Sequence, residues 1–272
     1  MKEFLYETHL HTRQGSACAD TEGKVYPRLY QDLGYDGIFI TDHFFGGNTA
    51  APRSGDWKNR VDEYMRGYED ARNEAEKIGF KVFFGIEQCF QTDEFLIYGI
   101  DRQYLYDHPE IECWSRHEMS ENIHAAGGCC VHAHPFRERG YIKDMHISPY
   151  TVDAIEAVNM GNHASEDATG IAFSGLLHLP MTCGSDVHSA RSIMPGKLCA
   201  VGFESELHSA LDYVKCILNH GPIHMHFPIN RVDGMRPTIP HTPAFIVEKD
   251  ESQVPFLPNE WFVTSNHTNI EI

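Results

Sequence analysis

Short apolar runs recur along the first two thirds of the chain, with longer polar stretches between them. The runs are mostly continuous in apolar side chains, which is typical of strands that are buried on both faces of a parallel sheet. The runs that predict strands are 4–8, 37–41, 81–86, 95–100, 128–131, 154–158 and 179–183.

Helical patterns lie between these runs. The longest covers 61–78 and ends at Gly79, a residue type that favours a helix C-cap. The pattern over 115–126 opens with Ser115 and Glu118 at capping-box spacing. Two further amphipathic patterns cover 26–33 and 205–218. Strands that alternate with helices predict an α/β fold, either a parallel barrel or a doubly wound sheet.

Polar residues at the ends of the apolar runs favour the barrel. Catalytic groups of α/β barrels come from the C-terminal ends of many strands, whereas a doubly wound sheet gathers its site at one switch point. Here the run ends carry His9, His11, Asp42, His43, Glu87, His132, His134, Asp186 and His188. Such a distribution predicts a closed or nearly closed barrel of about seven strands.

Composition narrows the class of protein. The 272 residues, 42% of them hydrophobic, suit one large α/β domain with a short appendage. The formal net charge of −17 argues against an extended nucleic-acid footprint. No apolar run reaches membrane-spanning length, the N-terminus lacks a secretory pattern, and the eight cysteines show no disulfide or zinc-finger spacing. We therefore expect a cytoplasmic protein with no membrane partner.

The pattern changes near Gly221. Seven prolines punctuate 222–272, and the periodicity is weak. We expect residues 1–221 to form the barrel and 222–272 to be an appended segment that packs on the barrel or on a partner.

Pairs of polar residues at i and i+2 point to a metal site. His9 and His11, His132 and His134, and Asp186 and His188 each direct two side chains to the same face of an extended strand. A metal ion needs three or four convergent donors, and a site with two ions needs a bridging carboxylate, for which Glu87 is the candidate. Histidine and carboxylate donors without thiolate suit Zn, Mn or Fe.

These segments together resemble the ordered motifs of the PHP (polymerase and histidinol phosphatase) superfamily. The motifs are 7–12, 40–43, 85–87, 133–135 and 184–188, and the resemblance runs from residue 7 to about 190. It implies a distorted (β/α)7 barrel of the TIM-like type, two or three divalent metal ions and phosphoesterase activity. The metal ligands that it implies are His9, His11, His43, Glu87, His134, Asp186 and His188.

The sequence departs from this pattern at two positions. The family usually has an Asp or His ligand six or seven residues after the second histidine, where this chain has Ala17 and Cys18, with Asp20 close by. The strand after Glu87 often begins with a histidine ligand, and Glu94 takes that place, with Asp101 at the other end of the run as the competitor. We include Glu94 among the expected ligands and leave the residue after His11 open.

Candidates for other roles flank the ligands. His132 is a candidate ligand, supporting group or proton donor, and Glu156 and Asn159 are candidate supports for the ligands. Arg137 follows His134 closely and is expected to bind substrate phosphate without contacting a metal ligand, since arginine suits bidentate contact with phosphate.

The sequence therefore predicts a metal-dependent phosphatase that acts on a small phosphorylated metabolite or nucleotide. A hydroxide held between two metals would attack phosphorus. One alternative is an amidohydrolase-type barrel that cleaves C–N bonds, although no lysine occupies the place where such sites commonly have a bridging modified lysine. The other is a non-catalytic module that metal ions stabilise.

Overall fold

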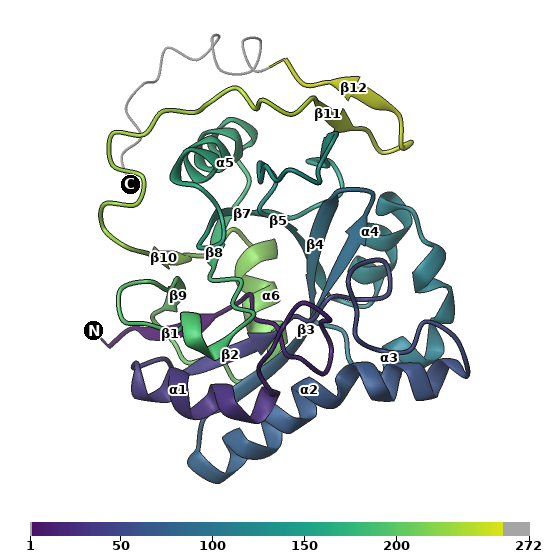
Figure 1. The fold of residues 1–272 in the computed structure, drawn as a ribbon, viewed down its shortest axis with the longest axis vertical. Coiled ribbons are helices and arrows are strands. Elements are labelled where there is room, and N and C mark those ends of the chain that lie inside the picture. The colour runs from purple at the N-terminus through teal and green to yellow at the C-terminus, as the bar shows by residue number, and fades with distance from the viewer. Residues whose placement is uncertain (1, 258–272) are drawn as a thin grey trace.

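A curled sheet of nine strands dominates the computed structural model, which describes residues 2–257 (Figure 1). The strands follow the order β10-β9-β1-β2-β3-β4-β5-β7-β8. They are β1 (Phe4–Glu7), β2 (Gly37–Ile40), β3 (Lys81–Phe90), β4 (Asp93–Tyr98), β5 (Cys129–Ala133), β7 (Ala154–Asn159), β8 (Met181–Gly184), β9 (Ala200–Phe203) and β10 (His224–His226).

The two ends of this sheet approach each other beyond β1 and β8. Leu10 and Val187 form a parallel bridge, the His11 amide donates to the Val187 carbonyl at 3.0 Å, and the Asp186 amide donates to the His9 carbonyl at 2.9 Å. The sheet is thus a nearly closed barrel, and the predicted α/β barrel is confirmed. The contacts that close it also bring the first and last metal-binding motifs together.

One strand runs against the predicted direction. β4 pairs antiparallel with both β3 and β5, so the expectation of parallel strands throughout is wrong. β3 continues to Phe90, well past the predicted end at Ile86, and only Gln91 and Thr92 separate it from β4. A two-residue connection makes a hairpin, since a parallel pair needs a crossover of a dozen or more residues. β9 also runs antiparallel to β1.

Six α-helices lie between the strands of the described chain. They are α1 (Tyr26–Asp32), α2 (Trp57–Ile78), α3 (Arg102–Asp107), α4 (Arg116–Ala125), α5 (Ala164–Leu177) and α6 (Ala210–Leu218), with short 3-10 turns at Gly23–Val25, Pro109–Cys113 and Ala190–Ser192.

The helix ends follow the sequence signals where those signals exist. Gly79 ends α2 with φ +67°, and Ser115 and Glu118 form the expected capping box of α4. The sequence pattern missed α5. Eight of its fourteen residues are buried, so the helix lacks the polar face that makes an amphipathic pattern visible.

Aromatic rings fill the barrel below the predicted site. The rings of Phe39, Tyr98 and Tyr213 lie with centroids 5.0–5.3 Å apart, and all three side chains are buried. The Tyr98 hydroxyl donates to the Thr8 carbonyl at 2.8 Å. This packed floor fixes the end of β1 just before His9 and leaves the other mouth of the barrel for polar side chains.

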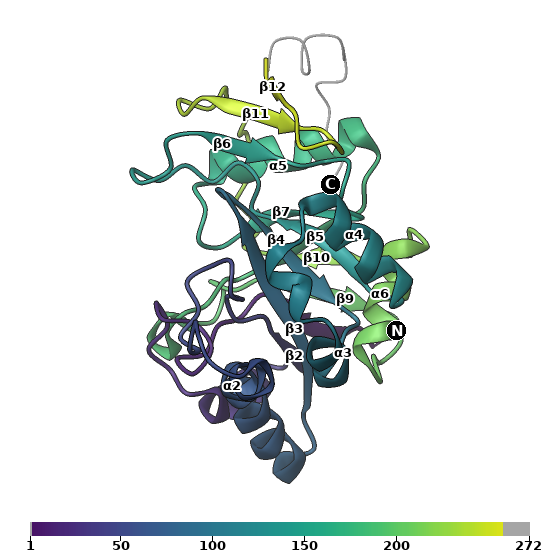
Figure 2. The same ribbon diagram turned by 90° about the vertical axis from the view of Figure 1, so that its right-hand side faces the viewer.

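The C-terminal segment is built into the fold over its described part. β10 pairs with β9, while β11 (Ala244–Val247) joins β6 (Met145–Ile147) and β12 (Gln253–Pro255) in a second sheet. Between β10 and β11 the chain passes around α5 (Figures 1 and 2). Residues 258–272 of the predicted appendage lie outside the described residues. No described helix has the length and apolar character to span a membrane.

Candidate metal centre

The closing contacts of the barrel bring four predicted ligands into one cluster. The Nε2 atoms of His9 and His11 lie 3.0 Å apart, and Asp186 Oδ1 lies 3.5 and 3.2 Å from them. The ring of His188 stacks on that of His11 with centroids 4.1 Å apart. Residues nearly 180 positions apart in the sequence therefore share one end of the barrel.

Glu87 lies at the centre of the cluster. Its Oε1 is 3.2 Å from His9 Nε2 and 3.3 Å from His134 Nε2, while its Oε2 is 3.4 Å from His11 Nε2 and 2.6 Å from His43 Nδ1. One carboxylate thus faces four imidazoles, two on each oxygen. This is the arrangement expected of a carboxylate that bridges two cations.

The antiparallel direction of β4 explains how Glu94 comes to lie beside Glu87 and the histidines of the cluster. Glu94 stands at the start of β4, which lies at the same mouth as the ends of the parallel strands, and its carboxylate is 3.5 Å from His134 Nε2 and 3.8 Å from His43 Nδ1. Asp101 instead caps α3 by accepting from the Tyr104 amide. The structure thus places Glu94, and not Asp101, beside the cluster.

Hydrogen bonds from the surrounding residues orient two of the histidines. His9 Nδ1 lies 2.8 Å from Glu156 Oε1, so its N–H faces a carboxylate and its Nε2 atom faces the cluster. The Ser16 hydroxyl donates to Asp42 and therefore accepts from His11 Nδ1 at 2.9 Å, which likewise directs the His11 Nε2 lone pair inward. Histidine metal ligands are usually oriented in this way.

This geometry meets the requirements of bound cations. Two inward nitrogen atoms 3.0 Å apart need either a shared proton or a cation between or beside them. His43 Nδ1 and Glu87 Oε2 are buried and lack a well-directed hydrogen-bond partner in residues 2–257. Four groups of residues each have donor atoms that lie within 4.8 Å of one another inside the group. They are His11, His43 and His188; His9, Glu87 and His134; His9, His11 and Asp186; and His43, Glu87 and Glu94.

Charges within the cluster offset the cost of burying it. Burial opposes ionisation of Glu87, but His43 and His9 outweigh it and hold the pKa of this carboxyl well below its ordinary value. Burial likewise opposes ionisation of Asp186, and Arg137 and His9 lower its pKa. Burial and the neighbouring Glu87 raise the pKa of Glu94. The first two carboxyls are therefore ready to bind cations at neutral pH.

Two cluster residues have unusual backbone conformations. His134 has φ +29° and Asp186 has φ +52°, both in a region that non-glycine residues seldom occupy. Gly184 makes room beside them, because a Cβ atom there would lie 2.3 Å from Glu156 Oε1 and 2.5 Å from His9 Cβ. Strain of this kind is concentrated at functional sites.

The positions left open after His11 are now placed. Asp20 is tied to Thr21 and Ser189 and does not enter the cluster. Burial acts to raise the pKa of the Cys18 thiol, but hydrogen bonds with His188 and His43 outweigh it and lower the pKa to about 6. Cys18 therefore borders the cluster on the side of these two histidines.

Arg137 lies at the cluster, but one expectation about it is wrong. Its Nη2 is 2.7 Å from Asp186 Oδ2, so it contacts a predicted metal ligand directly. Nη2 also donates to Asn159 Oδ1 at 2.6 Å, and Nε donates to Asn162 Oδ1 at 2.8 Å. The side chain is 15% exposed, which excludes a surface salt bridge.

His132 faces away from the metal cluster, so it is not a metal ligand, but it lines a cavity beside the cluster. It pairs across the strands with Phe95, while its neighbour Ala133 pairs with Glu94, so His132 faces away from the cluster. Burial lowers its pKa to about 4, and its ring packs against Phe95. His134 nevertheless faces the cluster, because its positive φ turns the chain and breaks the alternation of side-chain directions along the strand.

Sequence reasoning missed some supporting residues. Ser16, which lies outside every motif, contacts His11. Glu7, which lies in the first motif but was given no role, accepts from the His9 amide. Glu156 was expected as a support, and it contacts both His9 and the His134 amide. Only the closed barrel brings these residues together.

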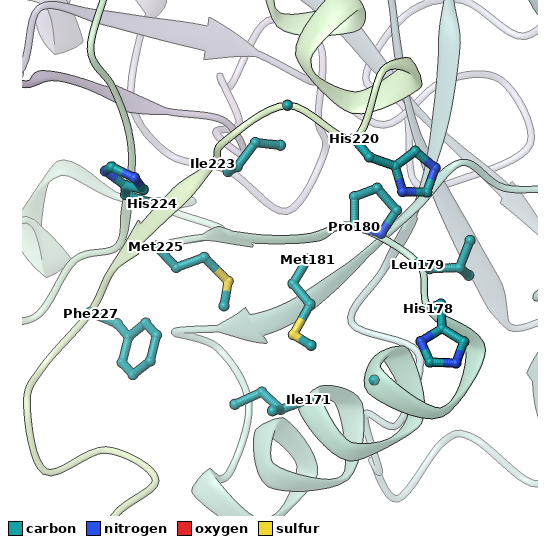
Figure 3. Close-up of a pocket in the computed structure, with 12 residues that line it drawn as sticks. Ile171, His178, Leu179, Pro180, Met181, His220, Ile223, His224, Met225 and Phe227 are labelled. Carbon is teal, nitrogen blue, oxygen red and sulfur yellow. The ribbon is translucent and has the colours of Figure 1, made fainter. Parts of the chain in front are cut away.

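Two hollows differ in their relation to the cluster. A cavity of about 250 Å³ adjoins it and is lined in part by Thr92, Glu94, His134, Arg137, Tyr141 and Met145. A larger hollow of about 680 Å³ lies between α5, β8 and β10 (Figure 3). None of the predicted ligands lines the larger hollow.

Comparisons with known proteins place the fold. No protein-family model matches the chain, and no curated protein sequence matches it. A protein of Bifidobacterium adolescentis assigned as a metal-dependent phosphoesterase is 16% identical with a TM-score of 0.50, over 80% of this chain and 96% of its own.

Two other solved structures are also similar. A two-domain protein of Bacteroides vulgatus containing a predicted PHP-like metal-dependent phosphoesterase is 16% identical with a TM-score of 0.58, over 84% of this chain and 65% of its own. PsfC of Pseudomonas syringae is 13% identical with a TM-score of 0.54, over 86% and 95%. Identities this low establish the fold alone, and at that level the resemblance to PHP-like phosphoesterases is confirmed.

Proposed function

We propose that this protein is a metal-dependent hydrolase that cleaves monoesters of phosphate on small molecules. The observation that carries the proposal is the pair of inward Nε2 atoms of His9 and His11, 3.0 Å apart and close to Glu87 and Asp186. Neutral imidazoles and ionised carboxylates in that arrangement are a donor set for cations. The names of the two phosphoesterase-like structural neighbours agree with this assignment.

The donor set divides into two halves that share Glu87. His9, His11 and Asp186 would hold one divalent ion, and His43, Glu87 and Glu94 would hold a second, with His134 close to both carboxylates. His188, with Cys18 beside it, is available to either the first ion or a third. Zn, Mn or Fe suits donors of these types. When bound, such ions lower the pKa of water and stabilise negative charge on phosphate oxygens.

Arg137 would bind the phosphate group of the substrate. Its Nε and Nη2 are held by Asn162, Asn159 and Asp186, whereas no hydrogen bond from Nη1 occurs within residues 2–257. A guanidinium whose orientation is fixed on one side offers its remaining N–H groups in a set direction. Charge on the transferred phosphoryl group would therefore meet a cation that needs little reorganisation.

The adjoining cavity supports a small substrate. Its volume of about 250 Å³ is enough for several water molecules or a compact alcohol. Tyr141 and Met145 give it an apolar side, while Glu94 and Arg137 form its side toward the cluster. The net charge of −17 also disfavours long polyanions.

Two alternative functions can be distinguished from phosphomonoester hydrolysis. An amidohydrolase-type site that uses a bridging modified lysine has no match here, because Glu87 occupies the bridging place. A non-catalytic metal module would keep the ions without turnover. The arginine beside the cluster and the adjoining cavity favour an enzyme, since a purely structural site needs neither.

A screen of metal-loaded protein tests the proposal. Protein reconstituted separately with Mn, Zn and Fe is assayed against small phosphomonoesters, phosphodiesters and an amide set. Hydrolysis of monoesters that chelator abolishes and metal restores supports the proposal. Metal binding with no hydrolysis of any ester would favour the non-catalytic module, and cleavage of amides alone would favour C–N hydrolysis.

A further inference from the structure

Arg231 in the C-terminal segment makes an unusually complete set of contacts. Its Nε donates to Asp167 Oδ2 at 2.6 Å, and its Nη2 donates to the carbonyls of Asn159 and Asn162, both at 2.8 Å. Its side chain is 13% exposed and that of Asp167 is fully buried. A segment far along the chain from the metal motifs thus reaches the end of β7 and the loop after it.

Asp167 carries these contacts to the same two asparagines. Its Oδ1 accepts from the Asn159 amide at 3.1 Å and from Asn162 Nδ2 at 3.0 Å. Burial raises the pKa of Asp167 to about 6, and the Arg231 guanidinium acts against that rise. Arg231 therefore binds the backbone carbonyls of both asparagines, while Asp167 binds the backbone amide of Asn159 and the side-chain amide of Asn162.

The side chains of these asparagines then hold Arg137. The Oδ1 atoms of Asn159 and Asn162 accept from Arg137 Nη2 and Nε, and Nη2 also faces Asp186. Gly161 lies close, because a Cβ atom there would be 2.9 Å from Arg137 Nη2. A continuous chain of hydrogen bonds therefore runs from Arg231 through three residues to the arginine beside the cluster.

We propose that Arg231 is a positioning residue for phosphate binding: through Asp167, Asn159 and Asn162 it sets the orientation of Arg137. The proposal rests on the proposed function and gives the C-terminal segment a part in it. Arg231 uses its planar guanidinium for three contacts in different directions, which the single ammonium of lysine does not reproduce. Its effect should therefore depend on Arg137 being present.

A double-mutant cycle in the metal-loaded full chain tests this coupling. The inhibition constant of inorganic phosphate, KM and kcat for one monoester, metal content and Tm are measured for R137A, R231A, R231K and R137A/R231A. R236A is the matched control, because Arg236 lies in the same segment and is exposed. We expect R231A to raise the phosphate inhibition constant by roughly tenfold, with a partial effect in R231K and none in R236A.

The double variant is the deciding case. R137A/R231A should bind phosphate no more weakly than R137A alone, with unchanged metal content. Additive losses, or a loss in R231A that follows Tm alone, would overturn the positioning role. If R231A folds poorly, Gly161→Ala crowds Arg137 from the opposite side and should raise the same constant. Wild-type protein that neither binds phosphate nor hydrolyses esters would refute the proposed function itself.

Discussion

Two of the hollows in the described part of the chain differ in size and in their distance from the candidate metal ligands. The larger, of about 680 Å³, is lined mainly by apolar side chains such as Met181, Met225 and Phe227 (Figure 3). The smaller, of about 250 Å³, adjoins Glu94, His134 and Arg137. The larger lies where α5, β8 and β10 meet, and the smaller lies at the mouth of the barrel.

The difference shows that volume alone is a poor guide to a site in this fold. The small cavity is lined by Glu94, whose pKa is raised, by His134, whose φ is +29°, and by Arg137, which pairs with the buried Asp186. Such features concentrate where charge is handled. The large hollow has room for an apolar ligand, but no described group of metal-binding residues borders it. Four substitutions or measurements would break or sharpen this contrast.

The largest effect is expected from Glu87→Ala. Removing the carboxylate that faces four imidazoles leaves two cations to repel each other, so at least one metal ion should be lost and hydrolysis should nearly vanish. Metal analysis and kcat measure this. Asp101→Ala is the control, since Asp101 only caps α3. Full metal content and activity in the Glu87 variant would refute the bridging assignment.

The second largest effect is expected from Arg137→Ala. It should lower kcat/KM for phosphomonoesters by roughly 10–1000-fold, the order of one lost charge-stabilising donor. His9 and His11 still face Asp186, so metal content should stay within error of wild type. Arg137→Lys should retain part of the activity. Unchanged kinetics would leave Arg137 a structural partner of Asp186 only.

A smaller effect is expected at the edge of the cluster. Because hydrogen bonds with His188 and His43 lower the pKa of Cys18 to about 6, its thiolate should form as pH rises through that value in metal-free protein. Alkylation followed by mass spectrometry at pH 7 should label Cys18 roughly tenfold faster than the exposed Cys113. Equal rates, or a Cys18 rate that rises only above pH 8, would contradict this environment.

The smallest effect is expected in the large hollow. Met225→Trp narrows it from the edge strand β10, and no predicted ligand lines this hollow, so kcat/KM should stay within about twofold of wild type. Steady-state kinetics and thermal melting measure this. A large loss of kcat/KM without a change in Tm would show that the hollow takes part in catalysis, and the contrast between the cavities would fail.

The sequence predicted the parts of the site that follow local rules. His9 with His11 and Asp186 with His188 stand at strand ends, and strand ends of a barrel share one mouth. Glu94 reaches the cluster because β4 runs antiparallel to β3. The sequence did not indicate this direction, because β3 continues four residues past its predicted end. The expectation that His132 and His134 face the same way is wrong, because the positive φ of His134 breaks the alternation of the strand.

Side-chain contacts between segments that are distant in the sequence could not be predicted. The pairing of Arg137 with Asp186 joins positions 49 residues apart, and Arg231 reaches Asp167 across 64. Side-chain networks of this kind leave no periodic trace in a sequence. α5 was missed because its buried residues include the polar side chains Glu166, Asp167, Thr169 and Ser174, so apolar and polar positions do not separate into two faces.

The metal content of the protein as purified tests the central claim most directly. Elemental analysis of full-length protein, prepared without chelator and measured against protein concentration, should find at least two transition-metal ions per chain. The Glu87→Ala variant prepared in parallel should contain at least one fewer. A content below one ion per chain in the wild-type protein, unchanged after incubation with Zn, Mn or Fe and gel filtration, would contradict the assignment of this cluster as a two-metal centre.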